Sequence, residues 1–345
     1  MSFDGVQKLE REMQRRDDAL WEWSVFWQSD QLDSCIPVNA PNDSDQLFST
    51  WREFFGALPA GARILDIGTG NGSVAAQAVA VSQEESKRFS IHGVDLAEID
   101  PPQFVTSARD LLQEITFHPC TPMEKLPFAD NHFDAVASQY ALEYSQTDKS
   151  LAEAMRVLRA RGHFRFLLHA QDGALKSRSQ LQRRQAETIL GSSLFVRLKD
   201  ALENIVAAEQ QRAPRVVTGA EESIAALKGV FDELEREFSQ TENRSLVDNL
   251  FAAVRRLPSL RRSYDLKTLL AMADDIRELL IAQAKRLQAM ERAALDDVAA
   301  KELIKQLRIN GATAVMLERA ATGEGHICVG YWLHGEKAAG STQDC

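Results

Sequence analysis

The stretch Ile64-Leu65-Asp66-Ile67-Gly68-Thr69-Gly70-Asn71-Gly72-Ser73-Val74-Ala75 decides the fold of this chain. An apolar run of strand character leads into three glycines at alternate positions, and a helical pattern follows. Glycine allows positive φ angles and lets a ligand approach the backbone closely. A strand, a glycine-rich turn and a helix in this order are typical of a nucleotide-binding turn in a parallel α/β sheet.

The spacing of the glycines favours one class of ligand. Dinucleotide-binding turns follow GxGxxG and place a pyrophosphate at the helix N-terminus. Here the spacing is GxGxG, Ser73 replaces the last glycine, and Asp66 lies two residues before Gly68. A carboxylate there opposes a pyrophosphate and suits a ligand with an ammonium and a sulfonium, so an NAD-dependent dehydrogenase is disfavoured. The predicted ligand-binding residues of this turn are Asp66, Gly68, Thr69, Gly70, Asn71 and Gly72.

A second acidic residue follows the next apolar run. Ile91-His92-Gly93-Val94-Asp95-Leu96 lies a little over 20 residues beyond the glycine turn. A carboxylate at the end of a neighbouring strand can accept hydrogen bonds from both hydroxyls of a ribose. We therefore expect Asp95 and Leu96 to lie in the same site.

Short strands and helices alternate from residue 62 onward, which predicts an α/β fold with a doubly wound, mostly parallel, seven-stranded sheet. The expected strands are Arg63–Ile67, Ser90–Val94, Ile115–His118, Phe133–Ser138 and His163–Leu168, and the clearest helix is Leu151–Arg159. Two β-rich runs near the end, Ala312–Leu317 and His326–Leu333, flank Thr322-Gly323-Glu324-Gly325 and predict an antiparallel hairpin. The polar residues Gly335–Cys345 are expected to form a frayed tail.

The region before the sheet is expected to be helical over 5–30 and 45–57, with a loop at Pro37–Ser44. The first helix ends in an aromatic cluster, Trp21, Trp23, Phe26 and Trp27. This cluster either closes over the ligand as a lid or packs as ordinary core.

Residues 172–308 are helical in pattern and form an insertion before the hairpin. Thr218-Gly219-Ala220-Glu221 is expected to cap a helix that carries the apolar stripe Ile224, Leu227, Phe231, Leu234 and Phe238. A second stripe belongs to a long helix and comprises Leu266, Leu269, Leu270, Ala273, Ile276 and Leu280. Arg255, Arg256, Arg261 and Arg262 either hold an acidic substrate or form a solvated corner between helices.

The expected domain boundaries follow from these patterns. They are an N-terminal helical segment at 1–58, a nucleotide-binding core at 59–171, the helical insertion at 172–308, the closing hairpin at 309–335 and a tail at 336–345. The insertion is expected to select the substrate or to mediate oligomerisation.

Composition narrows the class of protein further. The chain has 345 residues and a formal net charge of −10, which disfavours nucleic acid as a partner. Cys35, Cys120, Cys328 and Cys345 form no CxxC pair, so neither a zinc site nor a disulfide framework is expected. Neither a membrane span nor a signal peptide is apparent, and we expect a cytoplasmic protein.

These motifs resemble those of class I (Rossmann-like) S-adenosylmethionine-dependent methyltransferases, in their small-molecule branch. Pro122-Met123-Glu124-Lys125-Leu126-Pro127-Phe128, followed by Phe133-Asp134-Ala135-Val136, is similar to the E-x-LPF…FDxV region of that branch. The resemblance implies that Met123 and Glu124 flank the adenine. It also implies that Ser138-Gln139-Tyr140-Ala141-Leu142-Glu143-Tyr144 lies beside the methyl donor. It covers roughly 60–170 and the closing hairpin, but not the insertion.

Two departures from the family pattern matter. The acid that often precedes Leu-Pro-Phe and bonds the adenine amine is absent, because this neighbourhood is Cys120-Thr121-Pro122. The usual Pro-Gly-Gly before the fifth strand is Ala160-Arg161-Gly162. The loop after the fourth strand also lacks (N/D)PP(Y/F), which disfavours methylation of adenine in nucleic acids.

The resemblance implies a methyltransferase with S-adenosylmethionine as cofactor, Gln139 near it, and a small-molecule acceptor. Tyr140, Glu143, Tyr144 and His169 follow the fourth and fifth strands and are expected on the acceptor side, with His169 the candidate base. The alternative is a cofactor-binding pseudoenzyme or assembly module that uses the insertion for partner binding, including homo-oligomerisation.

Overall fold

The computed structural model describes residues 21–34, 41–211, 213–322 and 327–339. The chain divides into two compact units, one comprising residues 1–177 and 289–345 and the other 178–288. Residues 5–20 of the helix expected over 5–30, residues 37–40 of the loop expected over 37–44, the hairpin turn 323–325 and the tail from 340 lie outside the described residues.

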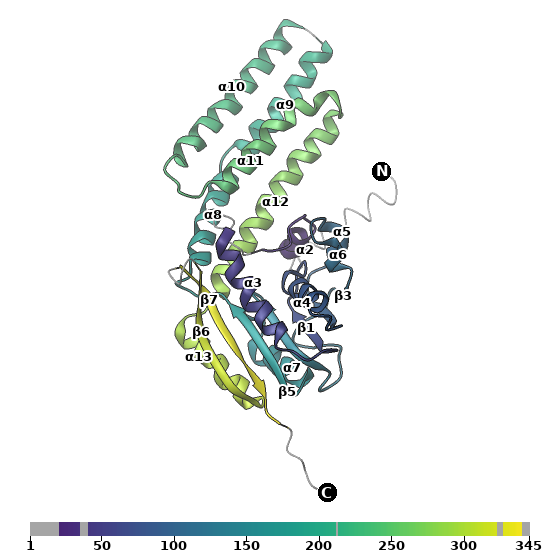
Figure 1. Cartoon of the computed structure of the whole chain (residues 1–345). Coiled ribbons are helices and arrows are strands. Elements are labelled where there is room, and N and C mark those ends of the chain that lie inside the picture. The colour runs from purple at the N-terminus through teal and green to yellow at the C-terminus, as the bar shows by residue number, and fades with distance from the viewer. Residues whose placement is uncertain (1–20, 35–40, 212, 323–326, 340–345) are drawn as a thin grey trace. The chain divides into compact units, whose positions relative to one another are not determined.

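The first unit is built on one seven-stranded sheet in the order β3-β2-β1-β4-β5-β7-β6 (Figure 1). The strands are β1 (Arg63–Ile67), β2 (Ser90–Val94), β3 (Ile115–His118), β4 (Phe133–Gln139), β5 (Leu158–Leu168), β6 (Ala312–Thr322) and β7 (Ile327–Lys337). The first five strands pair in parallel, and β7 pairs antiparallel to both β5 and β6. This is the doubly wound, mostly parallel sheet with a closing hairpin that the sequence predicts.

Both faces of the sheet are covered by helices, because neighbouring residues of each strand point to opposite faces. Ile64 packs in the core that contains α3 (Pro41–Gly56) and α4 (Ser73–Glu84). Leu65 packs in the opposite core, with α7 (Thr147–Val157) and α13 (Asp297–Ile309). The strands therefore end at a single edge between two helical layers.

Shorter elements complete this unit. They are α2 (Trp21–Trp27), α5 (Pro101–Phe104), α6 (Arg109–Leu112) and the 3₁₀ helix η1 (Leu142–Tyr144).

Several predicted boundaries are wrong, each for a local reason. Strand β5 begins at Leu158 rather than His163, because Leu158 already pairs with Phe133 directly after α7. Helix α3 begins at Pro41, inside the predicted loop, since proline suits the first turn of a helix. Strand β7 continues through Gly335 to Lys337, which the sequence assigned to the tail, because Glu336 pairs with His163.

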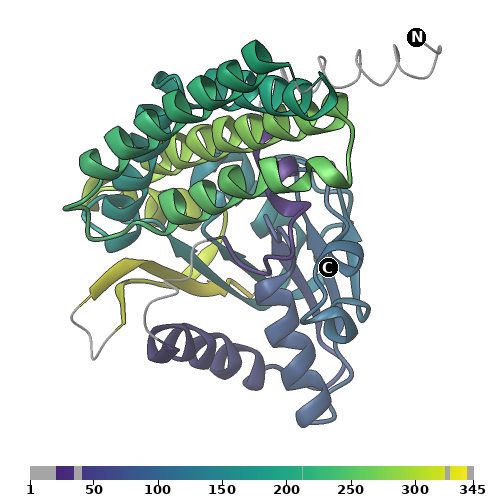
Figure 2. The ribbon, with the colours of Figure 1, turned by 90° about the horizontal axis from the view of Figure 1, so that it is seen from above.

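The second unit consists of helices that pack around their own apolar core. Its elements are α8 (Ala174–Gly191, from 178), α9 (Leu194–Gln211), α10 (Pro214–Glu237), α11 (Ser245–Arg256), η2 (Leu257–Arg262) and α12 (Leu266–Ala293, to 288). The long helices run side by side in both views (Figures 1 and 2). The two predicted stripes supply much of the core, although Ile224 is 47% exposed.

The predicted capping box in this unit is wrong. Helix α10 begins at Pro214, and Thr218 lies inside it, where its hydroxyl donates to the carbonyl of Pro214. Proline fixes the φ angle needed at the first helical position, so the helix starts one turn earlier than the Thr218 signal suggests.

The arginine-rich corner of the second unit is engaged by acidic side chains. Arg255 lies 3.1 Å from Glu235, and Arg261 donates to Glu209 at 2.7 Å. These contacts are those of a solvated corner between helices, and they weaken the hypothesis that the cluster waits for an acidic substrate.

Among the described residues, no helix is long and apolar enough to cross a membrane.

Candidate functional site

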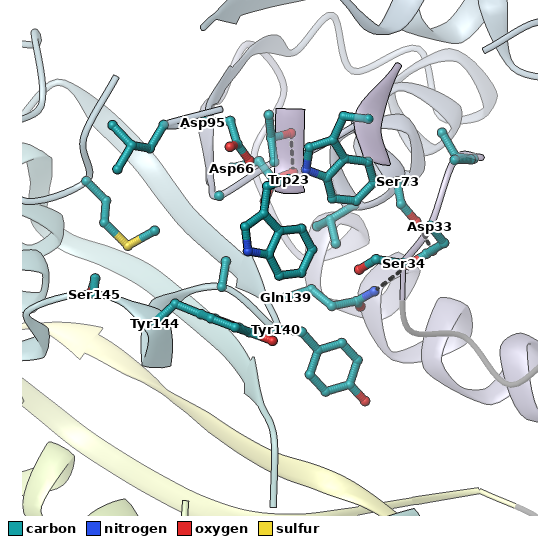
Figure 3. A pocket seen from close by; sticks show the side chains of 18 of the residues that line it. Trp23, Asp33, Ser34, Asp66, Ser73, Asp95, Gln139, Tyr140, Tyr144 and Ser145 are labelled. Carbon is teal, nitrogen blue, oxygen red and sulfur yellow. Dashed lines mark hydrogen bonds between the residues drawn. The ribbon is translucent and has the colours of Figure 1, made fainter. Parts of the chain in front are cut away.

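A cavity lies at the carboxyl ends of the first, second and fourth strands, where open α/β sheets bind ligands. Five segments line it (Figure 3). They contribute Trp23, Trp27 and Leu32–Ser34; Asp66, Gly68, Thr69, Ser73 and Val74; Asp95 and Leu96; Met123 and Glu124; and Gln139–Ala141, Tyr144 and Ser145. All the predicted cofactor residues line this cavity except Gly70, Asn71 and Gly72.

Asp66 supplies a buried carboxyl at the end of β1. Its side chain accepts a hydrogen bond from the hydroxyl of Thr69 at 2.7 Å and is 2% exposed. The pKa of Asp66 is raised to about 7, mainly by loss of hydration and to a smaller extent by the nearby carboxylates of Asp95 and Asp33, against the lowering effect of the hydrogen bonds from Thr69 and the amide of Ala75. A cationic ligand would lower this pKa again by favouring the charged form.

Asp95 occupies the corresponding position at the end of β2. One carboxylate oxygen accepts the amide of Gly70 at 2.8 Å, and the other accepts the amide of Ala97 at 2.9 Å. Loss of hydration raises the pKa of Asp95, while these backbone donors lower it. The two amides fix the carboxylate of Asp95 beside the glycine turn, where Asp95 lines the cavity.

The first two glycines of the turn are required by close contacts within the protein itself. Gly68 has φ +67°, and a Cβ there would lie 2.2 Å from the Cβ of Ala141 in the loop after β4. Gly70 has φ +51°, and a Cβ there would lie 2.3 Å from the ring of Trp27. The turn is thus packed against two other walls of the cavity.

Asn71 holds the segment that follows α2. Its side-chain amide is fully buried and donates to the carbonyls of Trp27, Ser29 and Gln31 at 3.1, 3.4 and 2.7 Å. The Asn71 side chain therefore caps the C-terminal end of α2 and does not line the cavity.

Further hydrogen bonds fix the same segment at its far end. The carboxylate of Asp33 accepts from the hydroxyl of Ser73 and, at 3.5 Å, from the amide of Gln139. The indole of Trp51 donates to Gln139 at 2.7 Å. Gln139, predicted beside the methyl donor, thus connects the end of β4 with the Asp33 segment of the cavity wall and with α3.

Aromatic rings form one side of the cavity. Trp23 and Trp27 stack with centroids 6.1 Å apart, and Tyr144 meets Trp23 edge-on at 5.5 Å. The aromatic cluster seen in the sequence therefore reaches the ligand site through Trp23 and Trp27, while Trp21 and Phe26 do not line it.

The loop after β4 carries two of the three predicted catalytic residues. Tyr140 lines the cavity in a left-handed conformation, φ 52°, and its hydroxyl donates to the carbonyl of Val329 at 3.1 Å. Glu143 lies behind the cavity wall, paired with the ring of His169. Both Glu143 and His169 are buried, and neither lines the cavity.

The predicted adenine end is held by backbone contacts. The amide of Thr121 donates to the carbonyl of Asp95 at 2.8 Å, and Glu124 accepts the amide of Gln146 at 3.0 Å. The first bond attaches the segment before Leu-Pro-Phe to the end of β2, and the second attaches it to the start of α7. Met123 and Glu124 line the cavity without the acid that the family often carries.

Sequence patterns missed Leu32, Asp33, Ser34, Ser73, Val74 and Ser145 as lining residues. Leu32, Asp33 and Ser34 lie far from the glycine turn in sequence, and the hydrogen bonds of Asn71, Ser73 and Gln139 hold their segment at the cavity. No group of three or more His, Cys, Asp or Glu residues suited to a metal ion occurs in the described part of the chain.

Comparison with known proteins identifies the core of this unit. Residues 65–166 match the family model described as "Methyltransferase domain". No curated protein sequence matches the chain.

Several solved structures are similar. The YcgJ protein from Bacillus subtilis has 25% identity and a TM-score of 0.31, with 41% of this chain and 59% of that chain covered. A geranyl diphosphate methyltransferase in complex with its substrate and sinefungin has 18% identity and a TM-score of 0.31, with 36% and 45% covered. The [4+2]-cyclase SpnF has 15% identity and a TM-score of 0.42, with 94% and 96% covered. The chain thus spans less than two thirds of the first two proteins.

The family match at 65–166 contains the glycine turn and nearly all of the five parallel strands of the sheet. S-adenosylmethionine is the cofactor of this class of domain. The chain therefore contains a class I, Rossmann-like, S-adenosylmethionine-dependent methyltransferase domain.

Proposed function

We propose that the chain is an S-adenosylmethionine-dependent methyltransferase that acts on a small-molecule acceptor by in-line methyl transfer. One observation supports this most strongly. Asp66 and Asp95, which end neighbouring parallel strands, line a single cavity together with the loop after β4. All of the lining residues except Trp23, Trp27 and Leu32–Ser34 lie within the methyltransferase domain at 65–166.

The residues of the cavity fit the chemistry of the cofactor. In this proposal Asp95 accepts hydrogen bonds from the ribose hydroxyls, and Leu96, Met123 and Glu124 flank the adenine. Asp66 faces the positively charged methionine end, which agrees with a buried carboxyl whose pKa of about 7 leaves it readily ionised by a cation. Gly68, Thr69, Gly70, Asn71 and Gly72 shape the turn, and Asp33 links Ser73, directly after the turn, to Gln139 at the end of β4.

When bound, the cofactor supplies an electrophilic methyl group on a sulfonium. The nucleophile of the acceptor would form a bond to the methyl carbon while the carbon–sulfur bond breaks. The electron pair of the carbon–sulfur bond would then stay on sulfur. The protein contributes alignment and exclusion of water, for which the stacked Trp23 and Trp27 and the edge of Tyr144 form a wall.

A proton must leave when the acceptor begins as OH or NH, and Tyr140, Glu143 and His169 remain the candidates for moving it. His169 is 1% exposed, with its ring 4.3 Å from that of Tyr140. Its burial favours a positioning role for the Glu143–His169 pair behind Tyr140. The assignment of His169 as the base stays a prediction.

A second candidate function is a cofactor-binding pseudoenzyme or assembly module. The observation in its favour is that residues 178–288 form a compact unit with a core of their own. Selection of the acceptor by the insertion, homo-oligomerisation through it, and cytoplasmic location remain predictions.

Two measurements, made one after the other, test these proposals. Calorimetry of the full chain with S-adenosylmethionine should give saturable binding, and absence of binding would overturn both candidate functions. Incubation with a labelled methyl donor and a fractionated metabolite pool should then transfer label to a small molecule. Binding without transfer to any fraction would favour the module.

A further inference from the structure

We propose that Asp33 is a cofactor-binding residue, whose carboxylate, together with Asp66, contacts the ammonium group at the methionine end of the cofactor. The inference rests on the proposed function, because it concerns the same cavity. It gives the segment that follows α2 a direct role in ligand binding.

The position of Asp33 along the cavity carries the first part of the argument. In Figure 3, Asp95 and Ser145 lie to the left of Asp66, whereas Asp33 and Ser73 lie to its right. All five residues line the same cavity. The proposed function places the ribose at Asp95, so the rest of the cofactor extends past Asp66 toward Asp33. This order brings the methionine end of the cofactor to the side of the cavity that contains Asp33.

The charge on this side of the cavity is negative. Asp33 lies close enough to Asp66 that its carboxylate contributes to the raised pKa of Asp66. None of the described residues that line the cavity is Lys, Arg or His. Two neighbouring carboxylates repel each other, and a cation that lies near both of them relieves this repulsion. This side of the cavity therefore favours a positively charged group of the ligand.

Hydrogen bonding indicates which positive group of the cofactor Asp33 contacts. The hydroxyl of Ser73 and the side-chain amide of Gln139, at 3.5 Å, donate to the carboxylate of Asp33 and hold it in the cavity wall. A carboxylate can accept about four hydrogen bonds, and a primary ammonium group donates three. A sulfonium has no N–H or O–H group to donate. The ammonium group is therefore the better partner for Asp33.

The backbone just before Asp33 is anchored by contacts with other parts of the protein. Asn71 donates to the carbonyl of Gln31 at 2.7 Å. The carboxylate of Asp30 accepts the amide and the hydroxyl of Thr106, each at 2.8 Å. Because these bonds form within the protein itself, the carboxylate of Asp33 is held at the cavity before a ligand binds. Such preorganisation reduces the entropy that binding costs.

The experiment compares two ligands on the full chain at pH 8 by isothermal titration. They are S-adenosylhomocysteine and 5′-methylthioadenosine, which keeps the adenine, the ribose and the thioether but lacks the amino-acid end. Asp33→Asn should weaken binding of S-adenosylhomocysteine about tenfold or more and change binding of 5′-methylthioadenosine by less than about twofold. If the variant keeps the wild-type ratio of the two dissociation constants, the inference is overturned and the proposed function stands. Failure of the wild type to bind either ligand would overturn both.

Asp30→Asn is the matched control, because it makes the same chemical change in the same segment. Asp30 holds Thr106 and does not line the cavity. Its replacement loosens the segment, so any loss of affinity should be the same for both ligands and the ratio of their dissociation constants should stay as in the wild type. A change of this ratio as large as that in Asp33→Asn would mean that attachment of the segment, and not contact with Asp33, carries the effect, and would overturn the inference.

A further ligand tests the contact on the wild type, whether or not a variant folds. This ligand is S-adenosylhomocysteine with hydrogen in place of its amino group. Without the ammonium group, the carboxylates of Asp33 and Asp66 lose their partner, and binding should weaken about tenfold or more. If this ligand binds as tightly as S-adenosylhomocysteine, the inference is overturned.

Discussion

The Nδ1 atom of His169 lies 2.7 Å from Oε1 of Glu143, and the two side chains are 1% and 0% exposed. The same oxygen accepts the backbone amide of His169 at 2.7 Å. This double contact ties η1, in the loop after β4, to the end of β5. The other oxygen, Oε2 of Glu143, has no hydrogen-bond partner among the described residues. The Glu143–His169 pair therefore holds in place the loop whose residues Tyr140 and Ala141 line the cavity.

Replacement of Glu143 by Gln should lower the free energy of unfolding by about 1–3 kcal/mol, because it weakens a buried, charge-assisted contact. Denaturation in urea measures the change. The matched control is Glu336→Gln, which alters the His163–Glu336 contact at 3.6 Å between side chains that are 46% and 48% exposed. That variant should stay within about 0.5 kcal/mol of the wild type. Equal effects of the two substitutions would contradict the structural role of Glu143.

Substitution of His169 separates positioning from proton transfer. Asparagine can still donate to Glu143, so His169→Asn should keep kcat within a few-fold and leave the pH–rate profile unchanged, whereas His169→Ala should lose at least tenfold. A general base contributes roughly 10²–10⁴-fold. If His169→Asn falls as far as His169→Ala and loses the acidic limb of the profile, His169 is the base after all.

The raised pKa of Asp66 links cofactor affinity to pH. A cationic ligand prefers the ionised carboxylate, and the pKa of Asp66 is about 7 in the ligand-free protein. Affinity for S-adenosylmethionine should therefore rise between pH 5.5 and 8 and then level off, with protons released on binding below about pH 7. Titration in buffers of different ionisation enthalpy measures this release. A flat profile in the wild type would contradict the prediction, and Asp66→Asn should bind weakly at every pH.

The same shift predicts that Asp66 destabilises the ligand-free fold. A folded-state pKa of about 7 against an ordinary 3.8 gives stability that is present below about pH 4 and lost as pH rises toward 7 and beyond. Asp66→Asn should therefore stabilise the ligand-free protein at pH 8, by about 4 kcal/mol at most. Thermal unfolding at pH 4.5 and pH 8 measures the difference. A variant less stable than the wild type at pH 8 would show that the Thr69 hydrogen bond outweighs the cost of burial.

Gly61, which lies before β1, is a matched control for the free-energy cost of adding a side chain at Gly70 in the glycine turn. Both have positive φ angles, +51° and +76°, but a Cβ at Gly61 meets nothing within 4 Å, whereas at Gly70 it meets Trp27. Gly61→Ala should cost about 1–2 kcal/mol, from backbone conformation alone. Gly70→Ala should cost about 1–3 kcal/mol more and weaken cofactor binding, because Trp27 must move. Equal losses of unfolding free energy in the two variants would mean that the Trp27 side chain moves aside without a measurable cost.

Most of the sheet was predictable because its signals are local. The bounds of β1, β2 and β3 were correct, since each is a short apolar run with a turn beside it. The early start of β5 was not predicted, because the arginine-rich stretch before His163 is polar and becomes a strand only by pairing with its neighbour β4. The start of α10 was misplaced because Pro214 outweighed the Thr218 signal.

The two acidic residues that follow β1 and β2 in the site were predictable from the sequence, and the residues that form the rest of the cavity wall were less so. Asp66 and Asp95 are marked by strands and glycines next to them in sequence. The contribution of Asp33 depends on hydrogen bonds to Ser73 and Gln139, which are separated from it by 40 and 106 positions. Asn71 looked like a ligand-binding residue because of its place in the turn, yet its side chain is directed to backbone carbonyls.

The pairing of β7 with β5 bears on how the chain is synthesised. His163 pairs with Glu336, which is synthesised about 170 residues later. At the usual 5–20 residues per second, the edge of β5 stays uncovered for roughly 10–30 s while the helices of residues 178–288 emerge. An apolar strand edge open for that long is a template for pairing with other chains. A chaperone bound at this edge would protect the nascent protein until the hairpin has been synthesised.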